Sequence, residues 1–574
     1  MTHEPDLERM LQEQQERLRA ELPPEAWDGT VRSATDSSVA EGNGREVSLP
    51  RICSNGRQLR DISRDALRAL QDCNHPPVLF VRSGMIVAIV HDEKKRQVIS
   101  GVGIDALCGR LARCADYFKV SPKGNEYDCS PPPGVVKDIL ALPPWEWNFP
   151  PLDALTEIPI IRPDGSILDT PGYDPATRLY YSPDPSLSIP ALSTEPSRDH
   201  IEIALHLIHR AIGEFPYADQ AGYANAIAAM LTPIIKPAID APAPLAIFDA
   251  PQAGTGKSLL CDVIAIIATG LAGEMFSAPR DEDEWRKVIT TALMTGTLVV
   301  IFDNVTRPLE SGDLCSVLTA STWADRAMRT HSKIALPVKA TFLASGNNVR
   351  LAGDMPRRCY RVRLDAKCST PFLRTGPEPG RQFTIDDLKA WTQEHRGELL
   401  AALLTLVRAW YMAGKPKPNI KPLGSFERWT VTVGGILENA GIEGFMENAT
   451  AMYQETDDES REWEGFLFVV HDVFYGEPFT VAEIVEKMNG KTGSFGSEPT
   501  PHAKELRAAL PGFLAEAMDR PGFFQRRIGH TFAGKTDRRF GESGVHLRKG
   551  TVLAGRQQWE VAIPGAGWHD ARPR

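Results

Sequence analysis

Apolar runs that end in polar residues recur through the middle of the chain. Runs typical of buried strands occupy 244–250, 297–302 and 339–345, and segments with apolar residues at helical spacing separate them. This alternation predicts an α/β block over about 242–365. Helical spacing over 385–413 then predicts a helical region after the block.

The N-terminal part of the chain has a different pattern. Residues 1–45 are rich in acids and lack periodicity, which indicates a solvated tail. Apolar segments on both sides of Ser83-Gly84 predict a β-hairpin, and helical spacing follows over 104–118. Dense prolines and turn dipeptides over 130–197 predict a β-rich connector, and Asp199 is the expected N-cap of the next helix.

The C-terminal segment carries signals for three helices and two strands. The expected elements are a helix capped by Thr480 and Glu483, a helix opening at Thr500-Pro501, a helix over 523–532, and strands over 545–550 and 558–563. This order is typical of a winged helix, a fold that binds DNA or docks proteins.

Composition and charge limit the class of protein. The 574 residues include 64 Lys and Arg against 74 Asp and Glu, a net charge of −10, so no overall positive field attracts nucleic acid. The longest apolar run, 263–272, is too short to span a membrane, the N-terminus lacks signal-peptide features, and the nine cysteines show no paired spacing. We therefore expect a cytoplasmic protein with no membrane partner, whose DNA contacts depend on local basic patches.

The strongest chemical signal is a P-loop pattern between a strand and a helix. The strand at 244–250 runs into Pro251-Gln-Ala-Gly-Thr-Gly-Lys-Ser258, and an apolar helix opens immediately afterwards. Glycines let backbone N–H groups turn toward phosphates, and the helix N-terminus adds positive potential. The residues expected to bind ATP are Gly254, Thr255, Gly256, Lys257 and Ser258, with Ser258 also a ligand of Mg²⁺. Pro251 replaces the usual first glycine, which changes the entry to the loop.

Polar residues at the ends of the next two buried strands extend this site. Asp303 follows the strand at 297–302 and is the expected second ligand of Mg²⁺, while Asn304 replaces the acid that often polarises the attacking water. Asn347 follows the third strand and could orient that water, although an Asx turn would also explain an asparagine there.

Two adjacent arginines follow the third strand. Arg357 and Arg358 could include an arginine finger that reaches ATP in a neighbouring subunit, or could form a salt-bridged pair at a domain edge. Alternate residues of a strand point in opposite directions, so only one of the two should face the neighbour. We favour Arg358, which lies nearer the following strand.

The motifs GTGKS, LVVIFDN, ASGNN and GDMPRR occur here in an order that resembles the helicase half of phage and plasmid primase–helicase proteins. That group is similar to superfamily 3 helicases of the AAA+ class, and the resemblance covers about 130–475. It implies a hexameric ring that translocates on DNA, with ATP bound by the P-loop, a Walker B role for Asp303, a sensor role for Asn347 and an arginine finger at Arg357 or Arg358. No acid pair typical of a primase is present before residue 130, so a cooperating primase would be encoded separately.

The resemblance also implies a DNA-binding hairpin before the third strand. His331 and Lys333 lie in that interval and would contact phosphates in the ring channel, unless the segment is simply a solvated basic loop. A second basic patch lies at 520–556, where nine Lys or Arg accompany two acids. Its expected DNA-contacting residues are Arg526, Arg527, Arg538, Arg539, Arg548 and Lys549.

The predicted parts are an acidic tail (1–45), a small α/β module (46–129), a Pro-rich β connector (130–197), a P-loop AAA+ ATPase domain (198–370), a helical region (371–475) and a winged-helix DNA-binding domain (476–574). We expect an ATP- and Mg²⁺-dependent helicase or translocase that acts on single-stranded or forked DNA in replication of a phage, plasmid or integrated element. The alternatives are an ATP-gated replication initiator, loader or regulator that does not unwind DNA, and an effector ATPase of phage defence.

Overall fold

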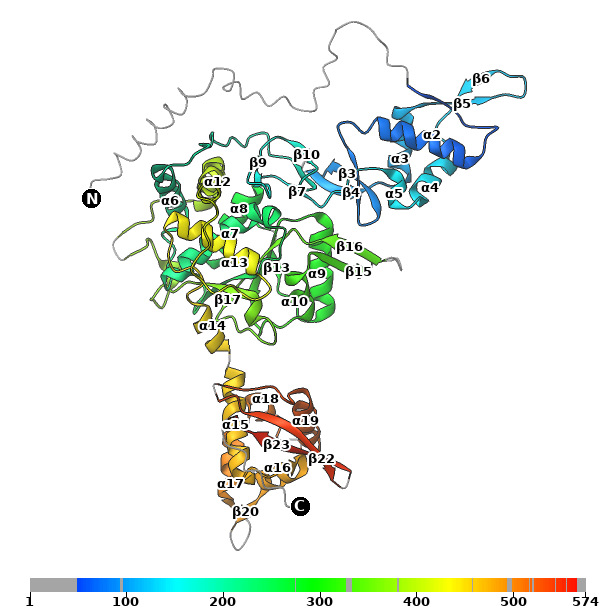
Figure 1. Cartoon of the computed structure of the whole chain (residues 1–574). Helices are drawn as coiled ribbons and strands as arrows, with labels where there is room; N and C mark the ends of the chain where they lie inside the picture. Colours follow the sequence, from blue (N-terminus) through cyan, green and yellow to red (C-terminus); the bar gives the residue numbers. More distant parts are fainter. Residues whose placement is uncertain are drawn as a thin grey trace. The chain divides into compact units, whose positions relative to one another are not determined.

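The chain folds into two compact units in the computed structural model (Figure 1), Met1–Ala449 and Thr450–Arg574. The structure describes residues 49–92, 97–273, 275–326, 333–378, 381–456, 458–492, 498–515, 517–518, 521–541, 543–553 and 555–564. The predicted acidic tail lies outside these residues. Within them, every helix is too short or too polar to cross a lipid bilayer.

An α/β module forms the beginning of the first unit. Its elements are β1 Arg51–Cys53, α2 Leu59–Asp72, β2 Leu79–Arg82, β3 Met85–His91, β4 Gln97–Gly101, α3 Ile104–Cys114, β5 Asp116–Val120, β6 Glu126–Asp128, α4 Pro133–Ala141 and α5 Pro144–Trp147. The predicted hairpin is confirmed, since β2 and β3 pair in antiparallel fashion on either side of Ser83-Gly84. The helix predicted over 104–118 is too long, because Tyr117 pairs with Ile52 of β1 and begins no further helical turn.

The core of this module also extends past the predicted boundary at residue 129. Val135, Val136 and Ile139 of α4 are fully buried, and they join Ile62 and Leu111 in one apolar cluster. Because α4 covers apolar faces of α2 and α3 that would otherwise meet water, it belongs to the module rather than to the connector.

The connector forms short strands, as its turn dipeptides predict. They are β7 Ala154–Thr156, β8 Ile160–Ile161, β9 Ile167–Leu168, β10 Gly172–Asp174 and β11 Leu179–Tyr181. Strands β10, β11 and β7 form one small sheet, and β8 and β9 form another.

A five-stranded sheet in the order β13-β14-β17-β12-β18 forms the centre of the first unit, and all its pairings are parallel. The strands are β12 Leu245–Ala250, β13 Met275–Ser277, β14 Val299–Val305, β17 Thr341–Asn347 and β18 Cys359–Arg363. The helices before and between them are α6 Arg198–Ile212, α7 Gln220–Ile239, α8 Lys257–Thr269, α9 Glu282–Thr295 and α10 Gly312–Thr319. The N-cap of α6 is Ser197 and not the expected Asp199. The Ser197 hydroxyl accepts from the His200 N–H, and Nδ1 of the His200 ring accepts from the Ser197 N–H.

The helical region packs on this sheet domain instead of standing apart. Its helices are α11 Leu388–Glu394, α12 Arg396–Met412 and α13 Glu427–Ala440. Helix α12 lies against α6 and α13 against α7 (Figure 1). Trp429 of α13 is fully buried, and its indole N–H donates to Thr232 Oγ1 of α7 at 3.1 Å.

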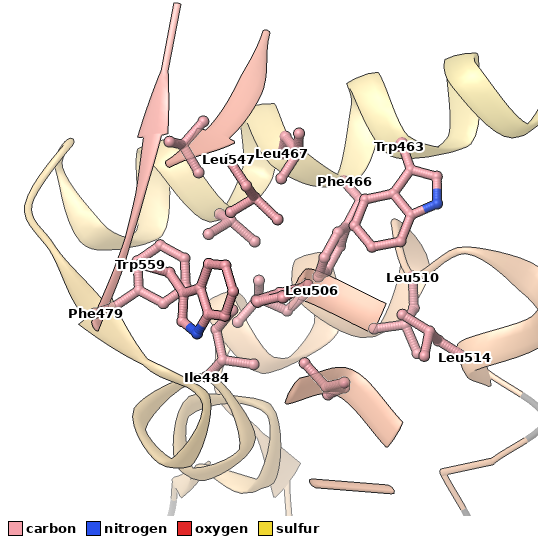
Figure 2. Close-up of a cluster of buried hydrophobic side chains, with 14 of the residues drawn as sticks. Trp463, Phe466, Leu467, Phe479, Ile484, Leu506, Leu510, Leu514, Leu547 and Trp559 are labelled. Carbon is pink, nitrogen blue, oxygen red and sulfur yellow. The ribbon is translucent and has the colours of Figure 1, made fainter. Parts of the chain in front are cut away.

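The second unit begins at Thr450, earlier than the predicted boundary at 476. Its elements are α14 Ala449–Thr456, α15 Asp458–Phe474, β19 Phe479–Thr480, α16 Val481–Asn489, β20 Lys491–Thr492, β21 Glu498–Pro499, α17 Pro501–Ala508, α18 Gly512–Ala515, α19 Pro521–Gly534, β22 His546–Leu553 and β23 Arg556–Ala562. The boundary differs because α15 supplies Trp463 and Phe466 to the apolar cluster of this unit (Figure 2).

The predicted helices and strands of this unit are present in their predicted order. Thr480 and Glu483 form the expected capping box, and Thr500 caps α17. Strands β19, β23 and β22 form an antiparallel sheet whose apolar side chains, including Trp559, enter the cluster of Figure 2.

Truncating Phe532 should destabilise the second unit. Phe532 is fully buried on α19, so Phe532→Ala removes apolar contacts and leaves a cavity, at a cost of about 3–5 kcal/mol. Hydrogen exchange of amides in α15 and β23 of the full chain would measure this loss. Phe523 lies on the same helix and is 54% exposed, so Phe523→Ala should change the same amides by less than about 0.5 kcal/mol. Equal effects of the two substitutions would contradict the described core.

Candidate functional site

Parallel pairing brings the three predicted strand ends to one edge of the sheet. Strand β17 lies between β12 and β14, and Asn347 is level with Ala250, the last residue before the P-loop. Because parallel strands present their carboxyl ends at the same edge, residues that follow β12, β14 and β17 become neighbours there.

The P-loop has the backbone geometry that its glycines predict. Gly254 and Gly256 have φ angles of +79° and +97°, which side-chain-bearing residues rarely adopt. Space is also limiting, since a Cβ atom would lie 2.7 Å from Phe372 Cβ at Gly254 and 2.9 Å from the Phe215 ring at Gly256. Helix α8 begins directly after the loop, at Lys257.

Lys257 is held among oxygen atoms. Its ammonium donates to Asn347 Oδ1 at 2.8 Å, to the Gln252 carbonyl at 3.1 Å and to Thr255 Oγ1 at 3.2 Å. The residue is 8% exposed, and this burial lowers the pKa of Lys257 although nearby carboxylates oppose the shift. The contact with Asn347 places the predicted sensor residue beside the P-loop lysine.

Asp303 lies beside Ser258. The Ser258 hydroxyl donates to Asp303 Oδ1 at 3.0 Å, and the Ser345 hydroxyl of β17 donates to the same oxygen. Pairing of β14 with β17 shifts between Phe302 and Val305, so Asp303 lies in an irregular stretch that redirects its side chain.

Asn304 has a backbone reason to be an asparagine. Its φ angle is +56°, a left-handed conformation that asparagine tolerates better than most residues. The position that often carries a second acid is therefore part of the irregularity in β14.

The buried carboxylate of Asp249, which the sequence analysis did not single out, supports the strand that leads into the P-loop. Asp249 is 1% exposed and pairs with the guanidinium of Arg363 from β18. It also accepts from the Val349 N–H at 3.0 Å, which fixes the turn after β17. Arg363 in turn donates to Asn348 Oδ1 at 3.2 Å. A charged residue inside the apolar run Leu245–Ala250 was the available signal, because a buried charge needs a partner.

Two other contributors were also missed. Ser345 precedes the predicted sensor residue and bonds to Asp303, but a serine in a buried strand is too common to be informative. Phe372 lies far along the chain from the P-loop, so only tertiary packing places it against Gly254.

The two arginines after β17 differ in their surroundings. Arg358 has a side chain that is only 14% exposed and donates to the Cys315 carbonyl at 3.0 Å and Thr319 Oγ1 at 3.1 Å, both in α10 of its own domain. The Arg357 side chain is 58% exposed and pairs with Asp354 at 2.6 Å. The geometry thus opposes our preference for Arg358 and leaves Arg357 as the side chain that faces outward.

An aromatic-walled cavity of about 530 Å³ opens beside the P-loop. Its lining includes Phe215, Gly254, Gly256, Leu259, Phe372 and Phe383. Charged residues line it as well, among them Arg210, Glu214 and Lys389, and clefts of this size that combine apolar walls with polar groups are typical of small-ligand sites.

The expected hairpin before β17 is present as two antiparallel strands, β15 Thr322–Arg326 and β16 Lys333–Pro337. His331 lies outside the described residues, and the structure describes the backbone of Lys333 but not its side chain.

The basic residues predicted in the second unit lie mainly on its surface. Arg526 and Arg527 are exposed on α19, and Lys549 is exposed on β22. Arg548 is half-buried and donates to His546 Nε2 at 3.2 Å. Arg538 and Arg539 are exposed in the segment between α19 and β22.

No protein-family model and no curated protein matches the chain. Among solved structures, an A-form apo structure of the NrS-1 C-terminal region is 12% identical, with 83% of this chain and 97% of that chain covered and a TM-score of 0.32. Another apo structure of that region is 11% identical, with coverages of 87% and 99% and a TM-score of 0.35. JCV helicase is 12% identical, with coverages of 42% and 66% and a TM-score of 0.18.

Removing the Asp249 carboxylate should weaken the sheet beneath the P-loop. Asp249→Ala leaves Arg363 and the Val349 N–H without their buried acceptor, at an expected cost of about 3–5 kcal/mol. Hydrogen exchange of amides in β12, β17 and β18 would report it. Asp354→Ala is the matched control, since the Asp354 side chain is 56% exposed and its pairing should contribute about 0–1 kcal/mol. A loss for Asp249→Ala no larger than that of the control would contradict a supporting role.

Proposed function

We propose that the protein is an ATP-dependent DNA helicase or translocase. The observation that carries the proposal is the contact of Lys257 with Asn347 and of Ser258 with Asp303. These contacts unite a P-loop, a carboxylate at a strand end and a polar residue at the neighbouring strand end, which is the arrangement that nucleoside triphosphate hydrolysis requires.

The chain's own residues fit ATP and Mg²⁺. The left-handed glycines and the start of α8 present N–H groups for phosphate oxygens, and Lys257 supplies a positive charge. Ser258 and Asp303 would hold Mg²⁺, which when bound neutralises charge on the β- and γ-phosphates. The cavity walled by Phe215, Phe372 and Phe383 would take the base, since aromatic faces stack on planar rings.

The outward-facing Arg357 supports hydrolysis between subunits. A guanidinium from a neighbouring protomer stabilises negative charge on the transferred phosphoryl group, and a ring, hexameric by resemblance, would supply one to every site. Arg357 forms a surface ion pair with the exposed Asp354, and exchanging this pair for a contact with a phosphate would cost little free energy.

DNA would be held at two places. The β15–β16 hairpin, with Lys333 at the start of β16 and His331 between the two strands in the sequence, would contact single-stranded DNA in the ring channel. In the second unit we interpret α16, α17, α19 and the β22–β23 hairpin as a winged helix, with Arg526 and Arg527 on the recognition helix. We further propose that the protein acts in replication of a phage, plasmid or integrated element, with any primase encoded separately.

A second function is an ATP-gated DNA-binding initiator, loader or regulator that does not unwind DNA. Asn304 favours it, because a side chain without an acid cannot act as general base. Such a protein would hydrolyse ATP slowly and protect one defined origin sequence.

The first test measures ATP hydrolysis and strand displacement on forked DNA. Single-stranded DNA should stimulate the ATPase, ATP should drive displacement, and Lys257→Ala should abolish both because the phosphates lose their cation. Lys287→Ala, an exposed lysine on α9, should leave both unchanged. An ATPase indifferent to single-stranded DNA, with no displacement, would exclude a helicase; protection of one origin sequence would then favour the initiator.

The second test asks whether Arg357 acts across subunits. Arg357→Ala should bind ATP and assemble but hydrolyse about 10³-fold more slowly. Arg358→Ala is the comparison, since Arg358 bonds within its own domain and its loss should mainly destabilise α10. Mixing Arg357→Ala with Lys257→Ala should restore part of the activity, because each supplies what the other lacks. Mixed oligomers without recovered activity would show that the site is not shared.

A further inference from the structure

One buried arginine of the N-terminal module donates hydrogen bonds to the last turn of α9. Arg82, the last residue of β2, is 6% exposed, and its Nη1 and Nη2 donate to the carbonyl oxygens of Met294 and Leu293 at 2.9 and 2.8 Å. Carbonyls in the last turn of a helix carry the negative end of the helix dipole, so a guanidinium suits them, and here it adds to the bond that the Leu293 carbonyl accepts from the Gly296 N–H at 3.3 Å. Burial lowers the pKa of Arg82 to about 10, which leaves the side chain charged at neutral pH.

The same edge of the module touches the β15–β16 hairpin. The Ser83 hydroxyl, in the turn after β2, donates to the carbonyl oxygen of Ala335 in β16 at 2.6 Å. Arg82 Nε donates to the Asp153 carbonyl at 3.2 Å, and the Asp153 carboxylate lies 3.5 Å from the ammonium of Lys339, two residues past β16. Two consecutive residues of the module therefore contact α9 and the hairpin directly, and Asp153 links Arg82 to Lys339 just beyond the hairpin.

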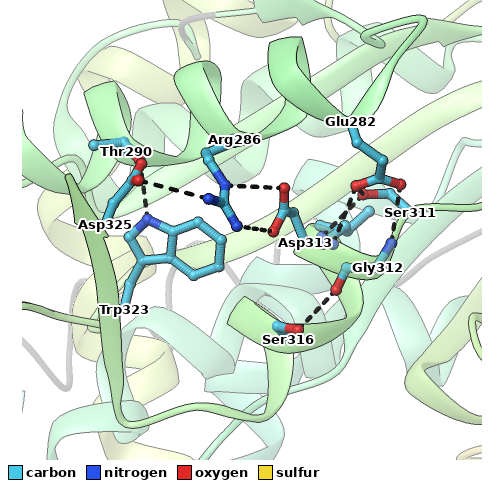
Figure 3. Close-up of polar contacts among 10 residues, drawn as sticks. Glu282, Arg286, Thr290, Ser311, Gly312, Asp313, Ser316, Trp323 and Asp325 are labelled. Atoms are coloured by element: carbon cyan, nitrogen blue, oxygen red, sulfur yellow. Dashed lines mark hydrogen bonds and ion pairs between the residues drawn. The ribbon is translucent and has the colours of Figure 1, made fainter. Parts of the chain in front are cut away.

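Helix α9 is itself bonded to the hairpin and to α10 (Figure 3). Thr290 Oγ1 donates to Asp325 Oδ2 of β15 at 2.6 Å and accepts from the indole N–H of Trp323 at 2.9 Å. One turn earlier, Arg286 donates to both carboxylate oxygens of Asp313 in α10, at 3.0 and 3.3 Å. A displacement of α9 would thus be passed to the base of the hairpin.

The apolar face of α9 packs on the strand that leads to Asp303. The ring centroids of Trp285 and Phe302 lie 4.7 Å apart, with an interplanar angle of 66°. Because packed rings are not easily compressed, α9 transmits its position to β14 as well as to the hairpin.

We propose that the N-terminal module fixes the position of the β15–β16 hairpin relative to β14, with Arg82 and Ser83 as the positioning residues. The consequence for DNA rests on the proposed function, because it assumes that the hairpin contacts DNA. The module then keeps the hairpin aligned with the nucleotide site during hydrolysis, so that DNA on the hairpin can accelerate the ATPase.

The experiment compares the full chain with Arg82→Ala, Arg82→Lys, Ser83→Gly and the control Arg68→Ala, an exposed arginine on α2 of the same module. Ser83→Gly removes the hydroxyl without backbone strain, since Ser83 has a φ angle of +52°. Two readouts are taken, which are hydrogen exchange of the last turn of α9 and of β15–β16, and the ratio of ATPase rates with and without single-stranded DNA.

In Arg82→Ala, exchange of these amides should rise about 10-fold or more, because the two charge-assisted hydrogen bonds to α9 and the one to Asp153 are lost. Arg82→Lys should show a smaller rise in exchange, because lysine keeps the positive charge although one ammonium cannot reproduce the two-pronged contact of a guanidinium. Ser83→Gly should raise exchange in β16 alone. Stimulation by DNA should fall about 5-fold or more in Arg82→Ala while the rate without DNA is retained. Arg68→Ala should match the unaltered chain in both readouts.

Unchanged exchange in β15–β16 in both Arg82→Ala and Ser83→Gly would overturn the proposal. Increased exchange in α2 and α3 as well would mean that Arg82→Ala unfolds the module, and Ser83→Gly then decides. If the unaltered protein shows no stimulation by DNA, the proposed function fails, but the exchange readout still tests the positioning.

Discussion

The parallel pairing of β12, β17 and β14 is the constraint on which the candidate site depends. Lys257 contacts Asn347 because Ala250, the last residue of β12, pairs with Asn347 of the adjacent strand β17. Successive side chains of a strand point to opposite faces, so a slip of one residue would turn Asn347 away from the P-loop. The irregular stretch in β14 adds a second requirement, since it turns Asp303 toward Ser258.

Buried charge is the second feature that organises this edge of the sheet. Asp249 and Lys257 are 1% and 8% exposed, and ionised groups are stable at such positions only when partners replace water. Arg363 supplies that partner for Asp249, and carbonyl, hydroxyl and amide oxygens surround Lys257. The polar groups beneath and beside the loop are thus held in place by partners within the protein.

Helix α9 connects parts of the first unit that are distant in sequence. Its last turn receives Arg82, its polar face bonds to the hairpin and α10, and its apolar face packs on β14. Each contact separately is ordinary, but together they give the N-terminal module a physical link to the strand that carries Asp303. The second unit, by contrast, has its own apolar core, built around residues such as Trp463 and Phe532.

Local signals in the sequence were enough to place the strand–loop–helix of the P-loop, Asp303 and Asn347 near the carboxyl ends of their strands, and the capping box of Thr480 and Glu483. Each depends on residues within a few positions of one another, where chain geometry leaves few alternatives. Tertiary structure alone decided that Arg357 faces outward, that Asp249 pairs with Arg363, that α4 belongs to the core of the N-terminal module and that α15 belongs to the core of the second unit. These outcomes depend on which distant segments bury one another, and a single chain's pattern of apolar residues does not encode that choice of partner.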